Sequence, residues 1–123
     1  RNTNMLIWHH ELWLIDHGAS LYFHHSWDNW EETMSKPFVQ IKDHVLLKKA
    51  TRVREIDQTF KANFSEENIS NILAVIPDEW LIEEGRELNP NEARAVYLSF
   101  LLGRLSNSEI FVKQIEHERE NSL

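Results

Sequence analysis

The hydrophobic pattern separates a short strand-forming segment at the N-terminus from a longer helical segment. Two apolar runs, Met5–Trp8 and Leu12–Ile15, flank the polar stretch His9-His10-Glu11. Bulky β-forming residues on either side of a polar turn are typical of a β-hairpin. Because neither run alternates cleanly between apolar and polar residues, we expect both faces of the hairpin, with Trp8 and Trp13, to be buried.

From about residue 43 to about residue 119, apolar residues recur at spacings of three and four, which is typical of helices with one buried face. The clearest start signal is Asn89-Pro90-Asn91-Glu92, an Asn cap followed by Pro at the first helical position and Glu at the third. We predict helices over residues 51–64, from Ser65 to about Val75, from Asn89 to about Leu105 and from Ser108 onward, with Ser65 and Ser108 as cap residues and with short turns near Asp43–Leu47 and after Pro77. The side chains expected on buried faces are Val53, Ile56, Phe60, Ile69, Ile72, Leu73, Ala93, Val96, Tyr97, Phe100, Leu101, Ile110, Phe111 and Ile115. The pattern therefore predicts one mainly α domain over residues 1–123 with an N-terminal β-hairpin.

Charge and composition narrow the function classes. The chain has 13 Lys and Arg against 20 Asp and Glu, a formal net charge of −7. This argues against general nucleic-acid binding, where affinity comes from cations on phosphates. No apolar run is long enough to predict a membrane span. The absence of Cys excludes disulfides, thiolate metal sites and Cys nucleophiles, and fits a reducing compartment such as the cytoplasm.

The base of the predicted hairpin carries the most informative polar residues. A hairpin over residues 4–16 brings its outer ends together, so we expect Asn2 and Asp16 to lie near each other. Asp16 ends a strand and enters a turn in which Gly18 can take a positive φ, so its carboxylate can project from the apolar hairpin. A carboxylate and an amide oxygen suit Mg²⁺, which completes its shell with phosphates and water. We predict a magnesium site at Asn2 and Asp16, with Asn4 as the alternative to Asn2.

An Asn, a hairpin and an Asp-x-Gly in this order resemble the metal-binding part of protein kinases. More specifically, the chain resembles the HipA-like kinase family, bacterial proteins related to the serine kinase toxins of persistence modules. The segments that carry this resemblance are residues 1–6, 12–19, 21–27, 43–47 and 76–81, of which Asp16-His17-Gly18 and Phe23-His24-His25-Ser26-Trp27 are the most specific. The resemblance implies that Asn2 is the catalytic-loop Asn and Asp16 the metal-binding Asp of the activation segment. It also implies that the full-length protein binds Mg²⁺ and ATP and phosphorylates a protein Ser or Thr.

The resemblance is incomplete. The catalytic Asp of the family would lie just upstream of Arg1, and the sequence shows neither a Gly-rich phosphate loop nor a strand Lys for the α- and β-phosphates. We therefore expect the chain to be the helical, large-lobe-like C-terminal portion of a longer kinase. It holds no catalytic residue in this interpretation. Phosphoryl transfer depends on positioning and charge neutralisation, so we expect no activity from this portion alone.

Two other function classes remain open. One is a non-enzymatic helical protein-interaction module in which the hairpin is purely structural. The other is a metal hydrolase, since imidazole and carboxylate groups suit Zn²⁺. Its ligands would come from His9, His10, His17, His24, His25 and Asp16. We favour the kinase interpretation, because neighbouring His residues point to opposite faces of a strand and the first pair lies at the turn, far from Asp16.

Overall fold

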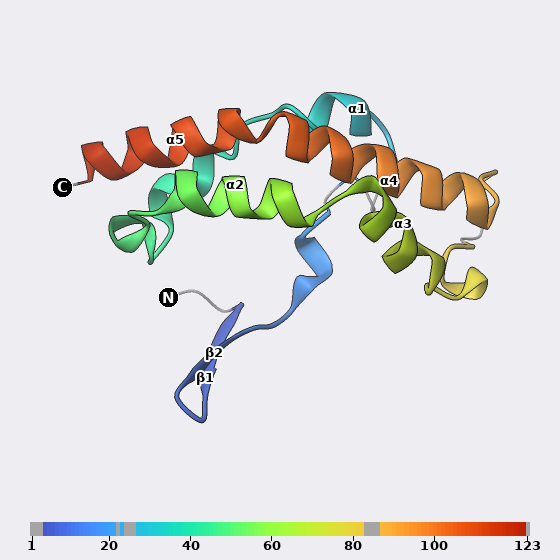
Figure 1. The fold of residues 1–123 in the computed structure, drawn as a ribbon, viewed down its shortest axis with the longest axis horizontal. Helices are drawn as coiled ribbons and strands as arrows, with labels where there is room; N and C mark the ends of the chain where they lie inside the picture. Colours follow the sequence, from blue (N-terminus) through green and yellow to red (C-terminus); the bar gives the residue numbers. More distant parts are fainter. Residues whose placement is uncertain (1–3, 22, 24–26, 83–86, 123) are drawn as a thin grey trace.

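The computed structural model of the chain describes residues 4–21, 23, 27–82 and 87–122. As predicted, it is mainly helical and begins with a two-stranded antiparallel hairpin (Figure 1). In chain order the elements are β1 (Met5–Trp8), β2 (Glu11–Leu14), η1 (His17–Ala19), α1 (Trp30–Thr33), η3 (Val39–Asp43), η4 (Leu47–Lys49), α2 (Val53–Asn63), α3 (Glu66–Ala74), η5 (Asp78–Trp80), α4 (Pro90–Ser106) and α5 (Ser108–Asn121), where η marks a 3₁₀ helix. Within the described ranges, no helix combines the length and apolarity needed to cross a bilayer.

Helices α4 and α5 follow one another along the long axis of the molecule, and the other helices pack against them. Helix α3 packs on α4, and α2 packs on α5 (Figure 1). The short elements α1 and η3 contact α4 and α5, respectively. The hairpin lies below these helices in Figure 1 and is connected to them through η1. The molecule therefore consists of a helical layer and an apolar hairpin that extends from it.

The largest hydrophobic core lies around the N-terminal two thirds of α4. Its buried members are Phe23, Ile69, Leu73, Leu81, Ala93, Tyr97 and Phe100. The Phe23 ring lies 4.5 Å from the Phe100 ring and 5.5 Å from the Tyr97 ring, between centroids, in tilted geometries. Gly103 continues the same helix where Met34 of the segment after α1 lies directly against it, so a Cβ there would displace the Met34 side chain. The predicted burial of α3 and α4 is confirmed at Ile69, Leu73, Ala93, Tyr97 and Phe100.

Helix α4 starts at the predicted signal. The Asn89 Oδ1 accepts hydrogen bonds from the backbone N–H groups of Asn91 (3.0 Å) and Glu92 (3.1 Å). The Glu92 carboxylate in turn accepts from the Asn89 backbone N–H at 2.8 Å, and Pro90 is the first helical residue. This reciprocal capping box satisfies three backbone donors that the first turn of a helix leaves without partners.

Replacing Asn89 by alanine is expected to lower the free energy of unfolding by about 1 kcal/mol, because two backbone donors lose their acceptor. Urea unfolding followed by circular dichroism measures this difference. Asn71→Ala, an exposed position inside α3, serves as the control and should be neutral or slightly stabilising, since Ala is the better interior helix former. Equal losses in the two variants would contradict the capping role.

Several predicted buried positions are exposed. Helix α2 forms, yet its Ile56 and Phe60 side chains are exposed, Phe60 by 50%. Ile72 and Ile110 are also exposed. Helix α2 contacts α5, but Phe60 borders an open groove rather than a packed core, so the apolar face of α2 is not fully covered. A helical period predicts which residues share a face, but it does not tell whether that face has a partner.

The predicted boundaries also shift at two places. Helix α5 begins at Ser108, and Asn107 rather than Ser108 occupies the cap position, without a side-chain cap. The turn expected near Asp43–Leu47 is replaced by two 3₁₀ turns on either side of it, η3 and η4. Neither shift changes the order of the elements.

Candidate functional site

The hairpin turn is made by His9 and His10, which both have positive φ (50° and 66°). Positive φ at both central residues is the geometry of a two-residue type I′ turn, whose twist matches that of the paired strands. The register pairs Met5 with Leu14 and Trp8 with Glu11. This register confirms the predicted hairpin, with β2 displaced by one residue towards the turn.

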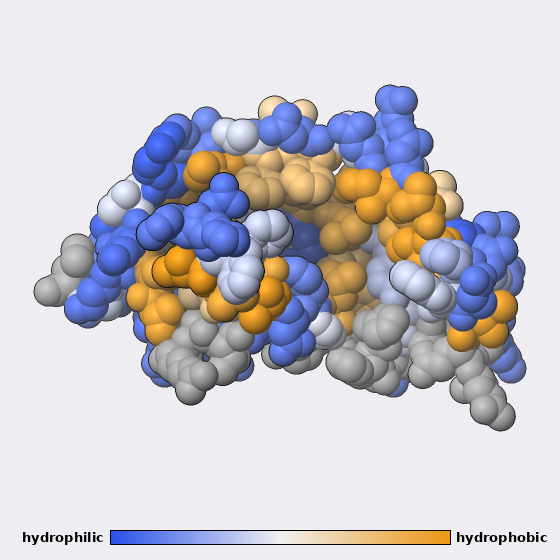
Figure 2. All heavy atoms as spheres, turned by 90° about the horizontal axis from the view of Figure 1, so that it is seen from below, coloured by the Kyte–Doolittle hydropathy of each residue, from blue (hydrophilic) through white to orange (hydrophobic). Residues whose placement is uncertain are grey.

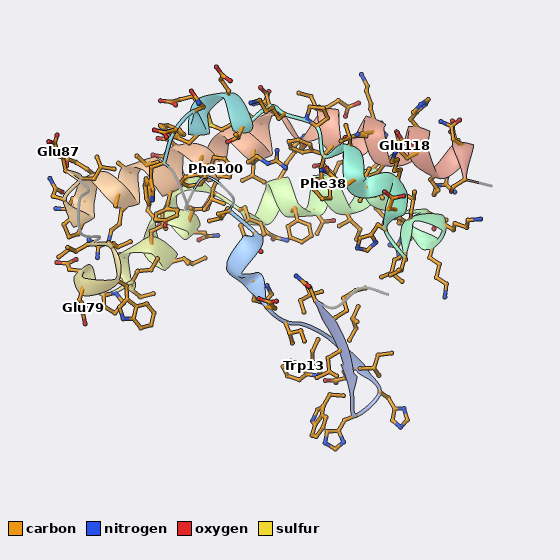
Figure 3. All side chains as sticks on the ribbon, turned by 180° about the vertical axis from the view of Figure 1, so that it is seen from behind. Trp13, Phe38, Glu79, Glu87, Phe100 and Glu118 are labelled. Atoms are coloured by element: carbon orange, nitrogen blue, oxygen red, sulfur yellow. The ribbon has the colours of Figure 1, made fainter. Side chains whose placement is uncertain are left out.

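The expected burial of the hairpin is wrong. The side chains of Trp8 and Trp13 are 58% and 50% exposed, and Figure 3 shows the labelled Trp13 on a hairpin that points away from the helices. The register places Leu6 opposite Trp13 on one face and Ile7 opposite Leu12 on the other, so both faces are apolar and both are exposed. Two strands alone provide no third layer to cover either face.

Asp16 follows β2 at the open end of the hairpin. Its own backbone takes the left-handed conformation (φ 55°, ψ 66°), which the short polar side chain of Asp tolerates. Gly18 lies inside η1, outside the left-handed region, so the expectation that Gly18 supplies the positive φ is wrong. The reversal of direction is made at the candidate metal ligand itself, and its side chain is exposed.

Asn4 is the described residue that faces Asp16 across the open end of the hairpin. Its Nδ2 donates to the Asp16 carbonyl at 3.2 Å, and its carbonyl accepts from the Ile15 N–H at 3.0 Å.

Asn2 lies outside the described residues, so its pairing with Asp16 stays a prediction. Also outside are Arg1, His24, His25, Ser26, Glu83 and Glu84. Among the described residues, the Asp16 carboxylate accepts no hydrogen bond and forms no ion pair.

A cavity of about 600 Å³ opens beside Asn4, between the start of the chain and the helical layer. Its polar lining includes Lys36 and Arg104, two cations that sequence analysis did not single out. Lys36 forms an exposed ion pair with Glu32, with an Nζ–Oε2 distance of 3.4 Å. Arg104 could have been noticed, because it continues the buried face of α4 one turn after Phe100.

Within the part of the chain that the structure describes, no group of three or more His, Asp or Glu side chains could share a metal ion. His9 and His10 lie at the tip of the hairpin and His17 lies beyond Asp16 at its base. The remaining candidates for a histidine site, His24 and His25, lie outside these ranges. The described histidines therefore give the metal hydrolase interpretation no support.

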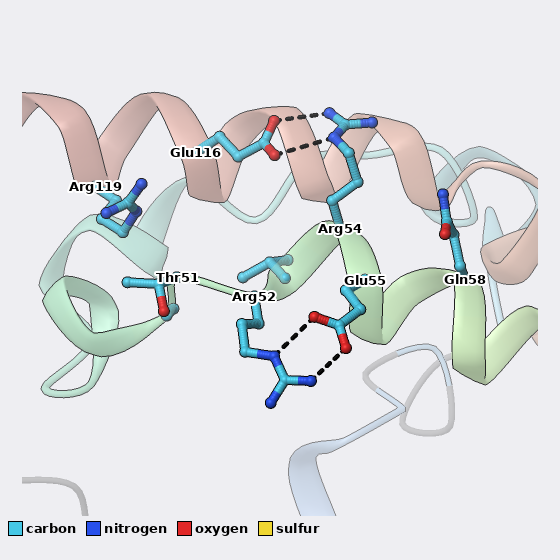
Figure 4. A pocket seen from close by; sticks show the side chains of 9 residues that line it. Thr51, Arg52, Arg54, Glu55, Gln58, Glu116 and Arg119 are labelled. Atoms are coloured by element: carbon cyan, nitrogen blue, oxygen red, sulfur yellow. Dashed lines mark hydrogen bonds and ion pairs between the residues drawn. The ribbon is translucent and has the colours of Figure 1, made fainter.

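A second cavity, of about 400 Å³, lies where α2 meets α5 and is lined by charged side chains (Figure 4). Arg54 donates from Nε and Nη2 to the two carboxylate oxygens of Glu116, at 3.1 and 2.7 Å, and from Nη1 to Glu109 at 3.0 Å. The hydrogen bonds of Glu116 and Glu109 raise the pKa of Arg54, and the hydrogen bond from Arg54 lowers the pKa of Glu116. Ionised, mutually paired groups of this kind join two helices and are not poised to exchange protons.

Asp57, on the same helix as Arg54, is also held ionised. Burial acts to raise the pKa of its carboxyl, but the nearby polar side chain of Ser108, the Lys61 ammonium and the charge of Arg54 together outweigh burial and lower it. The Lys61 Nζ lies 3.1 Å from Oδ2. Since the folded-state pKa is the lower one, this carboxylate stabilises the fold above its unfolded pKa and loses that contribution as the pH falls through the folded pKa.

The stability difference between the wild type and Asp57→Asn is therefore expected to be constant from neutral pH down to about pH 5 and to shrink below about pH 4. Urea unfolding at a series of pH values measures it. The physical reason is that the carboxyl becomes neutral at low pH in the wild type and so loses its charge interactions with Lys61. A difference that persists unchanged in strong acid would contradict this account.

No family model, no curated protein and no solved structure matches this chain. The chemistry of the described site is thus the basis for a functional conclusion. That chemistry is an exposed carboxylate in a left-handed turn, next to the amide side chain of Asn4, which itself borders a cavity with two cations.

Proposed function

We propose that the chain is the metal-binding, large-lobe portion of a HipA-like protein kinase. The observation that carries this proposal is Asp16, an exposed carboxylate that directly follows a two-stranded hairpin. Asn2 is the second proposed ligand of the metal, and Asn4 holds the backbone of Asp16 from the opposite strand. The order of Asn, hairpin and Asp-x-Gly is the order in which kinases present their metal ligands.

Among the described residues, Asp16 offers one exposed carboxylate for a magnesium ion. Mg²⁺ is bound through one or two protein oxygens together with phosphates and waters, so this carboxylate and the amide oxygen that we propose for Asn2 are an adequate donor set. When bound, Mg²⁺ would neutralise charge on the phosphates of ATP. The roles of the chain itself are to present the Asp16 oxygens outward and to hold the turn in place.

The proposal includes three expectations for the longer protein. An Asp upstream of Arg1 orients the acceptor hydroxyl, a separate small lobe holds the nucleotide, and a protein Ser or Thr is the acceptor. In this proposal the upstream Asp and the small lobe lie outside the 123 residues, so we expect these residues to be inactive by themselves. The lack of Cys fits a reducing compartment such as the cytoplasm.

A non-enzymatic interaction module is the second candidate, and one specific observation favours it. The hairpin exposes apolar side chains on both faces, which is unusual for a surface without a binding partner. In that case Asp16 would only shape the turn. The two candidates differ in whether the Asp16 carboxylate binds a divalent cation.

Manganese, a paramagnetic substitute for magnesium, separates the two candidates. Titrating Mn²⁺ into the ¹⁵N-labelled chain is expected to broaden the backbone resonances of Asn4 and of residues 15–18 first. Asp16→Asn should abolish this local broadening, because an amide replaces the charged ligand. Glu11→Gln, at the opposite end of the same hairpin, should leave it unchanged. Broadening at residues 15–18 that survives Asp16→Asn, or that never occurs there, would contradict the metal site.

A further inference from the structure

An apolar groove lies beneath the junction of α4 and α5, between the end of α2 and the start of α3. Its volume is about 370 Å³, within the range of small-molecule sites. We call it the α2–α4 groove; its lining is Phe60, Phe64, Ile69, Ile72, Leu73, Leu101, Arg104, Leu105, Ser108 and Phe111. Figure 2 shows this side of the molecule, with hydrophobic side chains gathered around a hollow. The Phe60 and Phe64 rings stack at 5.3 Å between centroids and form one wall.

Arg104 is the one charged residue of this lining. Its Nη1 donates to the backbone carbonyls of Thr33 (3.3 Å) and Lys36 (3.2 Å), and its guanidinium carbon lies 3.5 Å from the centre of the Phe111 ring. Neither Nε nor Nη2 has a hydrogen-bond partner among the described residues. The hydrogen bonds of Nη1 thus hold the guanidinium in place, and its Nε and Nη2 donors are available to a ligand.

Arg104 also has no acidic partner, again among the described residues. By contrast, Arg52, Arg54 and Arg94 each hydrogen-bond a carboxylate. Acidic residues outnumber basic ones in this chain by 20 to 13, so scarcity of carboxylates does not explain the difference. Burial lowers the pKa of Arg104 with no acid to oppose it, although an arginine remains charged at neutral pH. A partly desolvated cation without an anion is costly unless a ligand supplies one.

We propose that the α2–α4 groove binds a small organic carboxylate whose apolar body fills the groove and whose carboxylate pairs with Arg104. The fork of an arginine matches a carboxylate in two parallel hydrogen bonds, and the low dielectric of an apolar groove strengthens them. The aromatic wall of Phe60 and Phe64 favours a flat or ring-bearing body. The groove shares Arg104 with the cavity beside Asn4 but does not include Asp16, and the proposal does not depend on the kinase interpretation.

Matched ligands test the proposal without any mutation. 4-Phenylbutyrate and 4-phenylbutanol share the same apolar body, and only the first carries a carboxylate. Titrations followed by ¹⁵N chemical shifts are expected to show both ligands at groove residues, with the acid binding at least about tenfold more tightly, as a charge-assisted pair requires. Equal affinities, or shifts of the acid outside the groove, would overturn the proposal.

Variants then assign the effect to individual residues. Arg104→Gln should remove the advantage of the acid over the alcohol, whereas Arg52→Gln, an exposed arginine paired with Glu55 outside the groove, should preserve it. Phe60→Ser, at a half-exposed position, should weaken both ligands alike. If Arg104→Gln does not fold, the comparison of acid and alcohol on the wild type and on Phe60→Ser still decides the matter. An unchanged advantage of the acid in folded Arg104→Gln would overturn the assignment.

Discussion

Replacing Phe100 by alanine is expected to lower the free energy of unfolding by about 3–5 kcal/mol. Phe100 is 7% exposed and belongs to the main hydrophobic core around α4. Its ring packs at 4.5 Å from that of Phe23, between centroids, so truncation removes an aromatic contact as well as buried area. Because small domains are stable by only about 5–15 kcal/mol, this single change removes a large share of the total.

The matched control is Phe38→Ala, which makes the same chemical change at a site that is 46% exposed (Figure 3). Its cost is expected to be under about 1 kcal/mol, since little area leaves a packed environment. Urea unfolding monitored by tryptophan fluorescence measures both variants. Equal losses would mean that the core is not centred on Phe100.

The sequence predicted those elements correctly whose structure depends on contacts between residues close together in the chain. The Asn89 capping box and the Ser65 cap are confirmed because each depends on contacts within one helical turn. The hairpin is confirmed because bulky β-forming runs surround a two-residue turn. The type I′ geometry of the turn could not be predicted from its residues, because His9 and His10 replace the Asn-Gly pair that is common in such turns.

Burial was harder to predict, because it depends on distant partners. Ile56 and Phe60 have the correct helical spacing, but both side chains are exposed, and Phe60 lies at the edge of a groove. Trp8 and Trp13 are large and apolar, yet the hairpin extends away from the helices. Sequence periodicity describes one surface at a time, whereas burial requires two complementary surfaces.

At the candidate site, too, the sequence predicted part of the structure and missed the rest. Asp16 could be singled out from sequence, since it follows a strand and precedes a Gly. The conformation was not foreseen, because the left-handed residue is Asp16 and not Gly18. Arg104 was overlooked because a cation on an apolar helix face is normally read as a solvated side chain.

Loss of the Asp16 carboxylate is expected to have the largest effect on function. In the longer kinase that we propose, Asp16→Ala should lower phosphoryl transfer from ATP at least about a hundredfold, because the positioned charge that offsets the developing negative charge is lost. The fold should be preserved, since the carboxylate has no partner among the described residues, its side chain is exposed, and the left-handed backbone costs an alanine only about 1–2 kcal/mol. Glu11→Ala, at the other end of the hairpin, should change the rate less than about twofold.

The most direct test of the central claim is therefore the rate of ATP-dependent protein phosphorylation by the full-length protein and by its Asp16→Ala and Glu11→Ala variants. Circular dichroism of each variant establishes that it is folded. We predict phosphorylation by the wild type and by Glu11→Ala and its near-complete loss in folded Asp16→Ala. Undiminished phosphorylation by Asp16→Ala, or none by the wild type, would contradict the kinase interpretation and favour the interaction module.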